Sequence, residues 1–340
     1  MTMTAVSKQP SAELFFITMQ AYQRTAALKA AVELDLFTKI GEGANTAPAL
    51  AQKCDASERG TRILCDFLVV CGFLTKQGNT YALTLDSGTF LDRRSPAYLA
   101  SAVKFMTSPM MTENYNDLTA VVRKGGPVIN SQGTLAPEHP VWVEFARSMA
   151  PLQNMPSELL ANLLRADSGA KCKVLDIAAG HGMFGIAIAR HNPNAEIVAV
   201  DWPNVLEVAK ENAQAAGVAG RHRLLPGSAF DVEYGTDYDL VLLTNFLHHF
   251  DVPTNEQLLR KVHAALAPGG RAAALELVPN EDRVTPETPA AFSMMMLGST
   301  PAGDAYPYSE YERMFRNAGF SRCELHPLPP TFEQVVVAFK

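Results

Sequence analysis

From about residue 170 onward, short apolar runs alternate with stretches of helical periodicity. The runs are apolar at nearly every position, which is typical of strands buried on both faces. Strands of this kind, alternating with helices, indicate an α/β architecture with a parallel sheet between two layers of helices. The final apolar segments, SRCELHPL and TFEQVVVAFK, leave no room for a helix between them, so we expect an antiparallel strand pair there. The expected parallel strands are KVLDIA (173–178), EIVAVD (196–201), YDLVLLTN (238–245) and RAAALELV (271–278), with helices beginning at Met183, Pro203 and Thr254.

The first third of the chain predicts helices and one hairpin. Apolar residues recur at helical spacing over 11–38, 47–54 and 58–71. Two short strands, Phe73–Lys76 and Tyr81–Thr84, follow around the turn residues Gln77-Gly78-Asn79. Helices followed by such a hairpin form the winged-helix pattern. We therefore expect a mostly helical winged-helix domain at 11–95, a Met-rich helical linker at 96–165 and an α/β domain at 166–340.

A winged helix raises the question of DNA binding. Residues 1–110 hold 11 Lys/Arg against 9 Asp/Glu, a net charge of only +2, and the whole chain carries -6. The helix that would enter a groove, TRILCDFLVVCGFL, is nearly apolar all round, whereas base edges are recognised by polar side chains. A helix that is apolar on every face is a buried helix. We expect it in a subunit interface of a homodimer, with no nucleic acid as partner.

Cysteine usage and hydropathy indicate the compartment. The five cysteines form no C-x-x-C pair, and two of them, Cys65 and Cys71, lie in an apolar helical run. This favours a reducing environment over a disulfide framework or a zinc site. The N-terminus has no apolar signal-peptide core, and no apolar stretch reaches the ~20 residues that span a bilayer. We expect a soluble, cytoplasmic protein without a membrane partner and without a bound metal.

In an open α/β sheet, ligands bind beyond the carboxyl ends of the strands, where the strand order switches. Polar and glycine residues concentrate after the expected strands, as such a site requires. The candidate residues are Asp176, Gly180, His181, Gly182, Asp201, Trp202, Gly227, Ser228, Ala229, Phe230, Asn245, His248, His249 and Glu276.

The first of these loops, DIAAGHG (176–182), predicts an adenosine-containing cofactor. Gly180 and Gly182 permit positive φ and a close approach of backbone N–H groups to a ligand. Asp201 ends the second strand, where a carboxylate can accept both hydroxyls of a ribose. GHGMFG also satisfies G-x-G-x-x-G, a weak dinucleotide signal, so an NAD-dependent oxidoreductase stays an alternative. Asp176 makes the oxidoreductase alternative less favourable, because a carboxylate repels a pyrophosphate and suits a cofactor with an amino group.

At this point the sequence resembles the two-domain S-adenosylmethionine-dependent O-methyltransferases, from about residue 11 to the end. VLDIAAGHG is similar to V-L-D-V-G-G-G-x-G, with Ala178 and Ala179 in place of glycines, and VDWPNVLEVA to D-L-P-x-V-I-E-x-A. GSAF is similar to G-D-M-F, and LHHFDVPTNEQLLRKVHAALAPGG to a segment that begins L-H-D-W and ends A-L-x-P-G-G. The resemblance implies a class I methyltransferase Rossmann-like sheet with an N-terminal winged-helix domain for homodimerisation.

The resemblance also implies roles at the cofactor. Asp201 would hold the ribose, the Gly180 loop would pass over the amino-acid end, and Gly227–Phe230 would flank the adenine. Ser228 stands where the family has an adenine-contacting Asp. Phe145 and Met149 fall where the family lines the space beside the sulfonium. S-adenosylmethionine would be the cofactor and S-adenosylhomocysteine its product.

Methyl transfer to a phenol of pKa near 10 is helped by a general base, and His is the side chain best matched to neutral pH. The resemblance implies that His248 is this base, with His249 where Asp usually stands. Glu276 falls at one acid that orients the base, while the second acid position falls at Ala305, beside Asp304. This loss leaves methyl transfer to sulfur, nitrogen or carbon as alternatives. Since neighbouring residues point apart, we expect only one of the two histidines to face the site.

Apolar side chains for a small, aromatic hydroxylated acceptor are expected on two segments. Met adapts to irregular apolar ligands, although core packing is an equal alternative here. Tyr306 and Tyr308 are candidates to offer hydroxyls to the acceptor. The expected acceptor residues are Met106, Phe292, Met295 and Met296, with Met110, Met111 and Met294 nearby.

Overall fold

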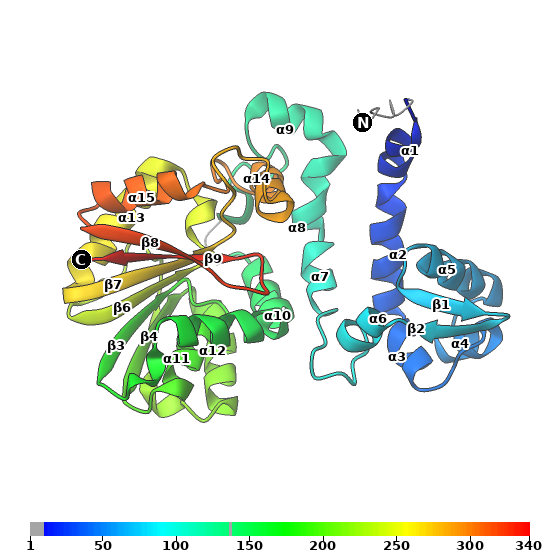
Figure 1. Ribbon diagram of the computed structural model, residues 1–340, viewed down its shortest axis with the longest axis horizontal. Helices are drawn as coiled ribbons and strands as arrows, with labels where there is room; N and C mark the ends of the chain where they lie inside the picture. Colours follow the sequence, from blue (N-terminus) through cyan, green and yellow to red (C-terminus); the bar gives the residue numbers. More distant parts are fainter. Residues whose placement is uncertain (1–9, 136–137) are drawn as a thin grey trace, which may run out of the picture. The chain divides into compact units, whose positions relative to one another are not determined.

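The computed structural model describes residues 10–135 and 138–340 (Figure 1). The chain forms two compact units, of which the first ends at Lys104 and the second begins at Phe105. Within the described ranges, no helix combines the length and the apolar character needed to cross a membrane.

The first unit contains helices followed by a two-stranded antiparallel hairpin, as expected. Ser57 begins one helix by accepting a hydrogen bond from the Gly60 backbone, and Thr84 begins another through a reciprocal capping box with Ser87. The core of the unit includes Phe37 and Leu68. Its elements are α1 (Glu13–Met19), α2 (Ala21–Glu33), α3 (Leu36–Gly41), α4 (Ala47–Lys53), α5 (Glu58–Val70), β1 (Leu74–Gln77), β2 (Thr80–Leu83) and α6 (Leu85–Phe90).

Helix α5, which is expected in a subunit interface, is only partly buried within the single chain. It is not enclosed on every face, because only Thr61, Cys65 and Leu68 are buried. Val70 is 73% exposed and Ile63 is 42% exposed. The helix therefore packs through one stripe within the single chain and leaves apolar side chains on its surface, so its expected place in a subunit interface stays a prediction.

The second unit is built on a seven-stranded sheet in the order β5-β4-β3-β6-β7-β9-β8. The five strands from β5 to β7 are parallel, and β9 and β8 join them as the expected antiparallel pair. Strand β5 was not among the expected strands. The strands are β3 (Cys172–Ile177), β4 (Ala195–Asp201), β5 (His222–Pro226), β6 (Tyr238–Thr244), β7 (Leu266–Glu276), β8 (Arg322–Pro327) and β9 (Gln334–Phe339).

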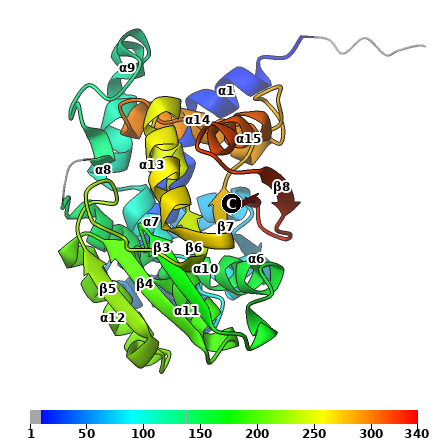
Figure 2. The same cartoon turned by 90° about the vertical axis from the view of Figure 1, so that its left-hand side faces the viewer.

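Helices cover both faces of this sheet (Figures 1 and 2). Two apolar cores result, one on each face; Leu175 and Val336 belong to the first, and Val174 and Val335 to the second. This alternation along single strands is why the runs read as continuously apolar. One face carries α10 (Val141–Leu163), α11 (Met183–His191) and α12 (Pro203–Ala215), and the other carries α13 (Val252–Ala265) and α15 (Tyr308–Asn317).

Short helices ahead of α10 pack against α14 (Glu287–Ser299). The Tyr115 hydroxyl donates to the Met294 carbonyl at 3.1 Å, and the Thr134 hydroxyl donates to the Ser299 carbonyl at 3.2 Å. These contacts join segments more than 150 residues apart beside the sheet. The short elements are α7 (Ala102–Met106), α8 (Pro109–Thr112), η1 (Glu113–Asp117), α9 (Leu118–Lys124), η2 (Gly133–Leu135), η3 (Ala166–Ser168), η4 (Ala219–Arg221) and η5 (Leu247–His249).

Candidate active site

The topology brings the expected site residues to one end of the sheet, where the parallel strands terminate. Strand β3 pairs with β4 on one side and with β6 on the other, so the strand order switches at β3. Ile177, its last residue, lies beside Val200 and Leu243. The loops that follow β3, β4 and β6 are therefore neighbours, and we call this region the carboxyl end of the sheet.

The glycine loop after β3 is tightly turned. Gly180 and Gly182 have φ of 57° and 75°, and Ala178, which replaces a glycine of the family motif, also has a positive φ of 55°. A Cβ atom at Gly182 would lie 3.0 Å from the Ala209 Cβ on α12. Glycine is thus required at 182 both by its backbone angle and by the closeness of α12.

Asp201 ties this loop to the end of β4. Its Oδ2 accepts a hydrogen bond from the Gly180 N–H at 2.8 Å, and its Oδ1 accepts one from the Trp202 N–H at 2.7 Å. Burial raises the pKa of Asp201 to about 6, although both hydrogen bonds act to lower it. Each carboxylate oxygen retains acceptor capacity, because an oxygen can accept two hydrogen bonds. The donor set therefore fits a ribose, which offers two neighbouring hydroxyl donors.

Asp176 is not brought to the same surface. Its side chain is fully buried, and Oδ2 accepts a hydrogen bond from the Gly185 N–H at 3.1 Å, in the first turn of α11. Oδ1 has no partner among the described residues. Burial, with a smaller contribution from the Asp201 charge, raises the pKa of Asp176 to about 7. One oxygen of this carboxylate ties the end of β3 to α11, and its expected role toward an amino group stays a prediction.

His181 and Phe145 lie together above the glycine loop. Their rings stack with centroids 6.3 Å apart, and His181 Nδ1 accepts a hydrogen bond from the Met183 N–H at 3.1 Å. Burial lowers the pKa of His181 to about 4, so the ring is neutral at physiological pH. Met149 packs in the same apolar neighbourhood as Phe145.

The loop after β5 reaches the site through the backbone. The Gly227 N–H donates to the Asp201 carbonyl at 2.9 Å. The Ser228 hydroxyl accepts from the Phe230 N–H at 3.1 Å, so it is used within its own loop. The Phe230 ring packs edge-on against Phe250 at 5.1 Å, and Ala229 accepts a hydrogen bond from the Tyr234 hydroxyl.

His248, in the η5 turn after β6, and Glu276, at the end of β7, form a buried pair. His248 Nδ1 lies 2.5 Å from Glu276 Oε2. The other oxygen, Oε1, accepts hydrogen bonds from the Phe246 and Leu247 N–H groups at 3.0 and 2.8 Å. The carboxylate therefore fixes both the η5 turn and the imidazole ring. Because Nδ1 faces Glu276, the nitrogen that remains for other chemistry is Nε2.

His249 has a different environment from its neighbour. Its ring packs edge-on against Trp142 at 5.4 Å, and its Nδ1 has no partner among the described residues. Burial, and then the nearby His248, lowers the pKa of His249 well below its usual value. Of the two neighbours, His248 is the one paired with a carboxylate, and its ring lies 4.8 Å from that of Phe292.

The second acid is absent where the family motif has it. Ala305 is fully buried, and Asp304 pairs with Arg283 at 2.8 Å. Glu333 was missed by the sequence reasoning: its Oε1 accepts a hydrogen bond from the Asn245 side chain at 3.0 Å, directly after β6. The signal was available, since a strand antiparallel to the others begins at the end where the others terminate.

The expected acceptor side chains are only partly brought together. A methionine–aromatic cluster contains Met295, but Met106 is 50% exposed and Met296 is buried outside it. The expectation for the tyrosines is wrong, because the hydroxyls of Tyr306 and Tyr308 donate to the carbonyls of Phe250 and Cys323. The cluster consists of Phe105, Met110, Met111, Val141, Trp142, Phe145, Met149 and Met295.

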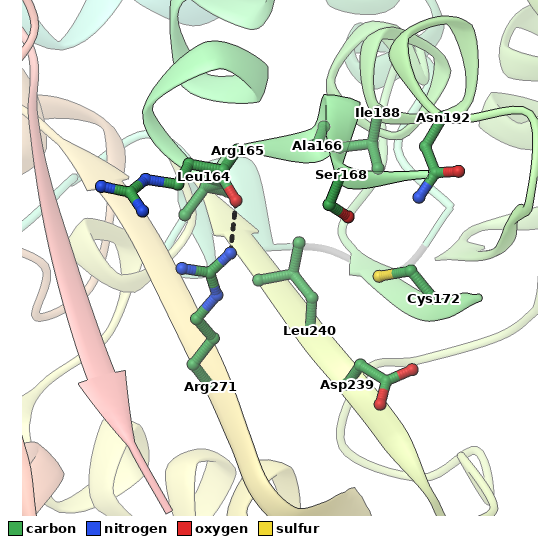
Figure 3. A pocket seen from close by; sticks show the side chains of 10 residues that line it. All are labelled: Leu164, Arg165, Ala166, Ser168, Cys172, Ile188, Asn192, Asp239, Leu240 and Arg271. Atoms are coloured by element: carbon green, nitrogen blue, oxygen red, sulfur yellow. Dashed lines mark hydrogen bonds between the residues drawn. The ribbon is translucent and has the colours of Figure 1, made fainter. Parts of the chain in front are cut away.

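A cavity of about 110 Å³ lies elsewhere, near the amino ends of the strands (Figure 3). It is lined by Cys172 at the start of β3 and Asp239 near the start of β6, and Arg271 donates to the Leu164 carbonyl at its rim. Because it lies at the opposite end of the strands, it is separate from the site described above.

Comparison with known proteins agrees with this geometry. Residues 143–321 match the O-methyltransferase domain, and residues 17–93 match the O-methyltransferase dimerisation domain. The crystal structure of a Nostoc punctiforme protein described as a presumptive O-methyltransferase superposes on this chain with a TM-score of 0.94. The two sequences are 58% identical, and the match covers 98% of this chain and 100% of that chain.

More distant relatives have defined reactions. The 3-hydroxy-5-methyl-1-naphthoate 3-O-methyltransferase of Streptomyces sahachiroi is 29% identical over 303 residues, which cover 88% of this chain and 86% of the relative. Human N-acetylserotonin methyltransferase, solved in complex with S-adenosylmethionine, shares the fold at 22% identity, with a TM-score of 0.83 and 99% of both chains covered. The chain therefore belongs to the O-methyltransferase family and is an S-adenosylmethionine-dependent methyltransferase with an N-terminal dimerisation domain.

Proposed function

We propose that this enzyme methylates a hydroxyl group of a small aromatic metabolite, with His248 as the general base. The observation that carries the proposal is the buried pair of His248 Nδ1 and Glu276 Oε2, 2.5 Å apart at the carboxyl end of the sheet. In this proposal the domain of residues 11–95 forms the dimer, residues 96–165 supply helices that face the acceptor, and the domain of residues 166–340 binds the cofactor. No metal takes part.

The cofactor site is assigned to the loops after β3, β4, β5 and β6. S-adenosylmethionine, when bound, supplies an electrophilic methyl group on a sulfonium. Asp201 receives the two ribose hydroxyls, and the backbone of 180–182 with His181 covers the amino-acid end. Trp202, Asn245 and residues 227–230 complete the site, while Phe145 and Met149 exclude water beside the sulfonium.

His248 removes the proton of the acceptor hydroxyl. Its Nε2 accepts that proton while Nδ1 stays directed at Glu276, which stabilises the imidazolium that results. The other task of the chain is positioning, since in-line transfer depends on holding the acceptor oxygen near attack distance. The half-buried Phe292, 4.8 Å from His248, and Met295 of the methionine–aromatic cluster supply apolar walls for an aromatic acceptor.

The direct test is turnover with labelled S-adenosylmethionine and a panel of phenols and naphthols. We expect S-adenosylhomocysteine and an O-methyl ether in equal amounts. A matched set in which the hydroxyl is already methylated should give no product. Product carrying its label on carbon, sulfur or nitrogen would contradict the O-transfer, and binding of NAD in place of S-adenosylhomocysteine would contradict the cofactor.

Cofactor affinity should depend on pH through Asp201. With a pKa of about 6, this carboxyl is ionised above pH 6 and becomes protonated as the pH falls through 6. A protonated carboxyl accepts hydrogen bonds from ribose less well, so the Kd for S-adenosylhomocysteine should rise by about tenfold between pH 7.5 and pH 5. Calorimetry across that range measures it. A Kd that stays constant would contradict the ribose role or the raised pKa.

We assign the homodimer contact to helix α1. No residue of this helix is buried, and Leu14, Phe15 and Phe16 are 76%, 62% and 58% exposed. The end of this apolar helix overlaps the first residues of the matched dimerisation domain, and a helix of this kind is suited to a second copy of the chain. The double variant Leu14→Glu/Ile17→Glu should be monomeric by light scattering, whereas Glu13→Gln should remain dimeric. A dimer that survives the double variant would place the interface elsewhere.

A further inference from the structure

Glu333 enters the active site from a direction that the family motifs do not cover. Strand β9 runs antiparallel to β7, and Gln334 is paired with Glu276. Glu333 immediately precedes Gln334, so it lies at the carboxyl end of the sheet, beside the strand that supplies Glu276. Its backbone is held in place, since its N–H donates to the Thr331 hydroxyl and its carbonyl accepts from the Leu328 N–H.

The Glu333 side chain reaches across β7 to the segment that carries the base. Its Oε1 accepts a hydrogen bond from Asn245 Nδ2 at 3.0 Å, and the Asn245 N–H donates to the Leu275 carbonyl at 2.8 Å. Asn245 has a positive φ of 53° and joins β6 to the turn that holds His248. The carboxylate thus contacts the residue where the chain leaves the sheet toward His248.

The charges around this carboxylate are few. The charges that act on it are those of Glu276 on β7 and His248 in η5; His249 in turn interacts electrostatically with His248, and Tyr311 on α15 with Glu276. Burial and the Glu276 charge raise the pKa of Glu333, whereas the Asn245 hydrogen bond and His248 lower it. His249 is kept neutral and Ala305 carries no charge. Of the two neighbouring histidines, His248 is the one that is paired with a carboxylate.

We propose that Glu333, in its ionised form, is a positioning residue for the base: it replaces the acid missing at Ala305 and supplies, with Glu276, the second negative charge that stabilises protonated His248. This rests on the proposed function. As the acceptor O–H bond breaks, an N–H bond forms at His248 Nε2; the acceptor oxygen gains the methyl group as its bond to sulfur breaks. The positive charge of the sulfonium is thereby replaced by one on the imidazole, until the proton leaves to solvent.

Glu333→Gln tests the charge, because it preserves the size of the side chain and an oxygen for Asn245. The variant should lower kcat about tenfold and move the lower limb of the pH–kcat profile to lower pH by about half a unit, since the imidazolium loses a favourable charge. The assay uses a phenol of pKa near 10 as the acceptor, because such a phenol stays protonated over this range. The KM for the acceptor and the Kd for S-adenosylhomocysteine should stay within about twofold.

Two further variants separate the effect of the Glu333 charge from the effect of its hydrogen bond to Asn245. Asn245→Ala removes the hydrogen bond but leaves the carboxylate, so its pH limb should stay closer to that of the unmodified enzyme. Glu324→Gln, the same substitution on β8, should change neither kcat nor the limb. If the lower limb of the pH–kcat profile does not move in the Glu333→Gln variant, the proposal is overturned. A His248→Ala enzyme that keeps its turnover overturns the proposed base itself, whatever Glu333 does.

Discussion

Replacing His248 by Asn is expected to lower kcat by about 10²- to 10⁴-fold, the range contributed by a positioned general base. The amide nitrogen of Asn can still donate to Glu276, so the buried carboxylate keeps a partner. What the variant lacks is an acceptor at the position of Nε2. The loss should therefore fall on kcat, with the Kd for S-adenosylhomocysteine unchanged within about twofold.

The pH profile adds a second readout for this variant. Without a base, turnover depends on the fraction of acceptor that is already ionised, so kcat should rise about tenfold per pH unit up to the pKa of the phenol. His249→Asn is the matched control, because this ring packs against Trp142 and has no carboxylate partner in the described structure; its kcat should change by less than tenfold. If the His248 variant retained most of its turnover, the enzyme would work by proximity alone.

A strand could be predicted from the sequence where its residues are apolar along nearly its whole length. The four expected parallel strands are each buried on both faces, and each was found in the sequence. Strand β5 was missed because its sequence, HRLLP, is not continuously apolar: two of its five residues are His and Arg. Such residues are tolerated there because β5 lies at the edge of the sheet. For helix α5, the sequence does not show which apolar side chains pack inside the chain and which stay on its surface for a partner.

Side-chain direction limited the prediction of the site. Strand ends located Asp201, His248 and Glu276, since topology alone brings them to one end of the sheet. Burial of Asp176 and the internal use of the Tyr306 hydroxyl depend on packing that no motif encodes. Glu333 could not be predicted from the rule that ligands bind after parallel strands, because this carboxylate precedes an antiparallel strand.

Asp201→Asn should weaken cofactor binding, whereas His248→Asn should lower kcat and leave cofactor binding unchanged. The substitution replaces one carboxylate oxygen by an NH₂ group, which would face the N–H of either Gly180 or Trp202 and leave a buried donor without an acceptor. A charged hydrogen-bond partner lost in this way changes affinity by about 10- to 100-fold, and the ribose loses an acceptor as well. We expect the Kd for S-adenosylhomocysteine to rise about 100-fold at pH 7.5 and its dependence on pH to disappear.

The thermal shift produced by S-adenosylhomocysteine should shrink with the affinity, because ligand stabilisation follows mass action. Glu196→Gln, an exposed substitution on the same strand, should keep the full shift. Saturating cofactor should restore part of the kcat of the Asp201 variant, since its His248–Glu276 pair is intact, whereas no cofactor concentration should restore the His248 variant. An Asp201 variant that binds within threefold of the unmodified enzyme would show that the carboxylate serves only to hold the glycine loop to β4.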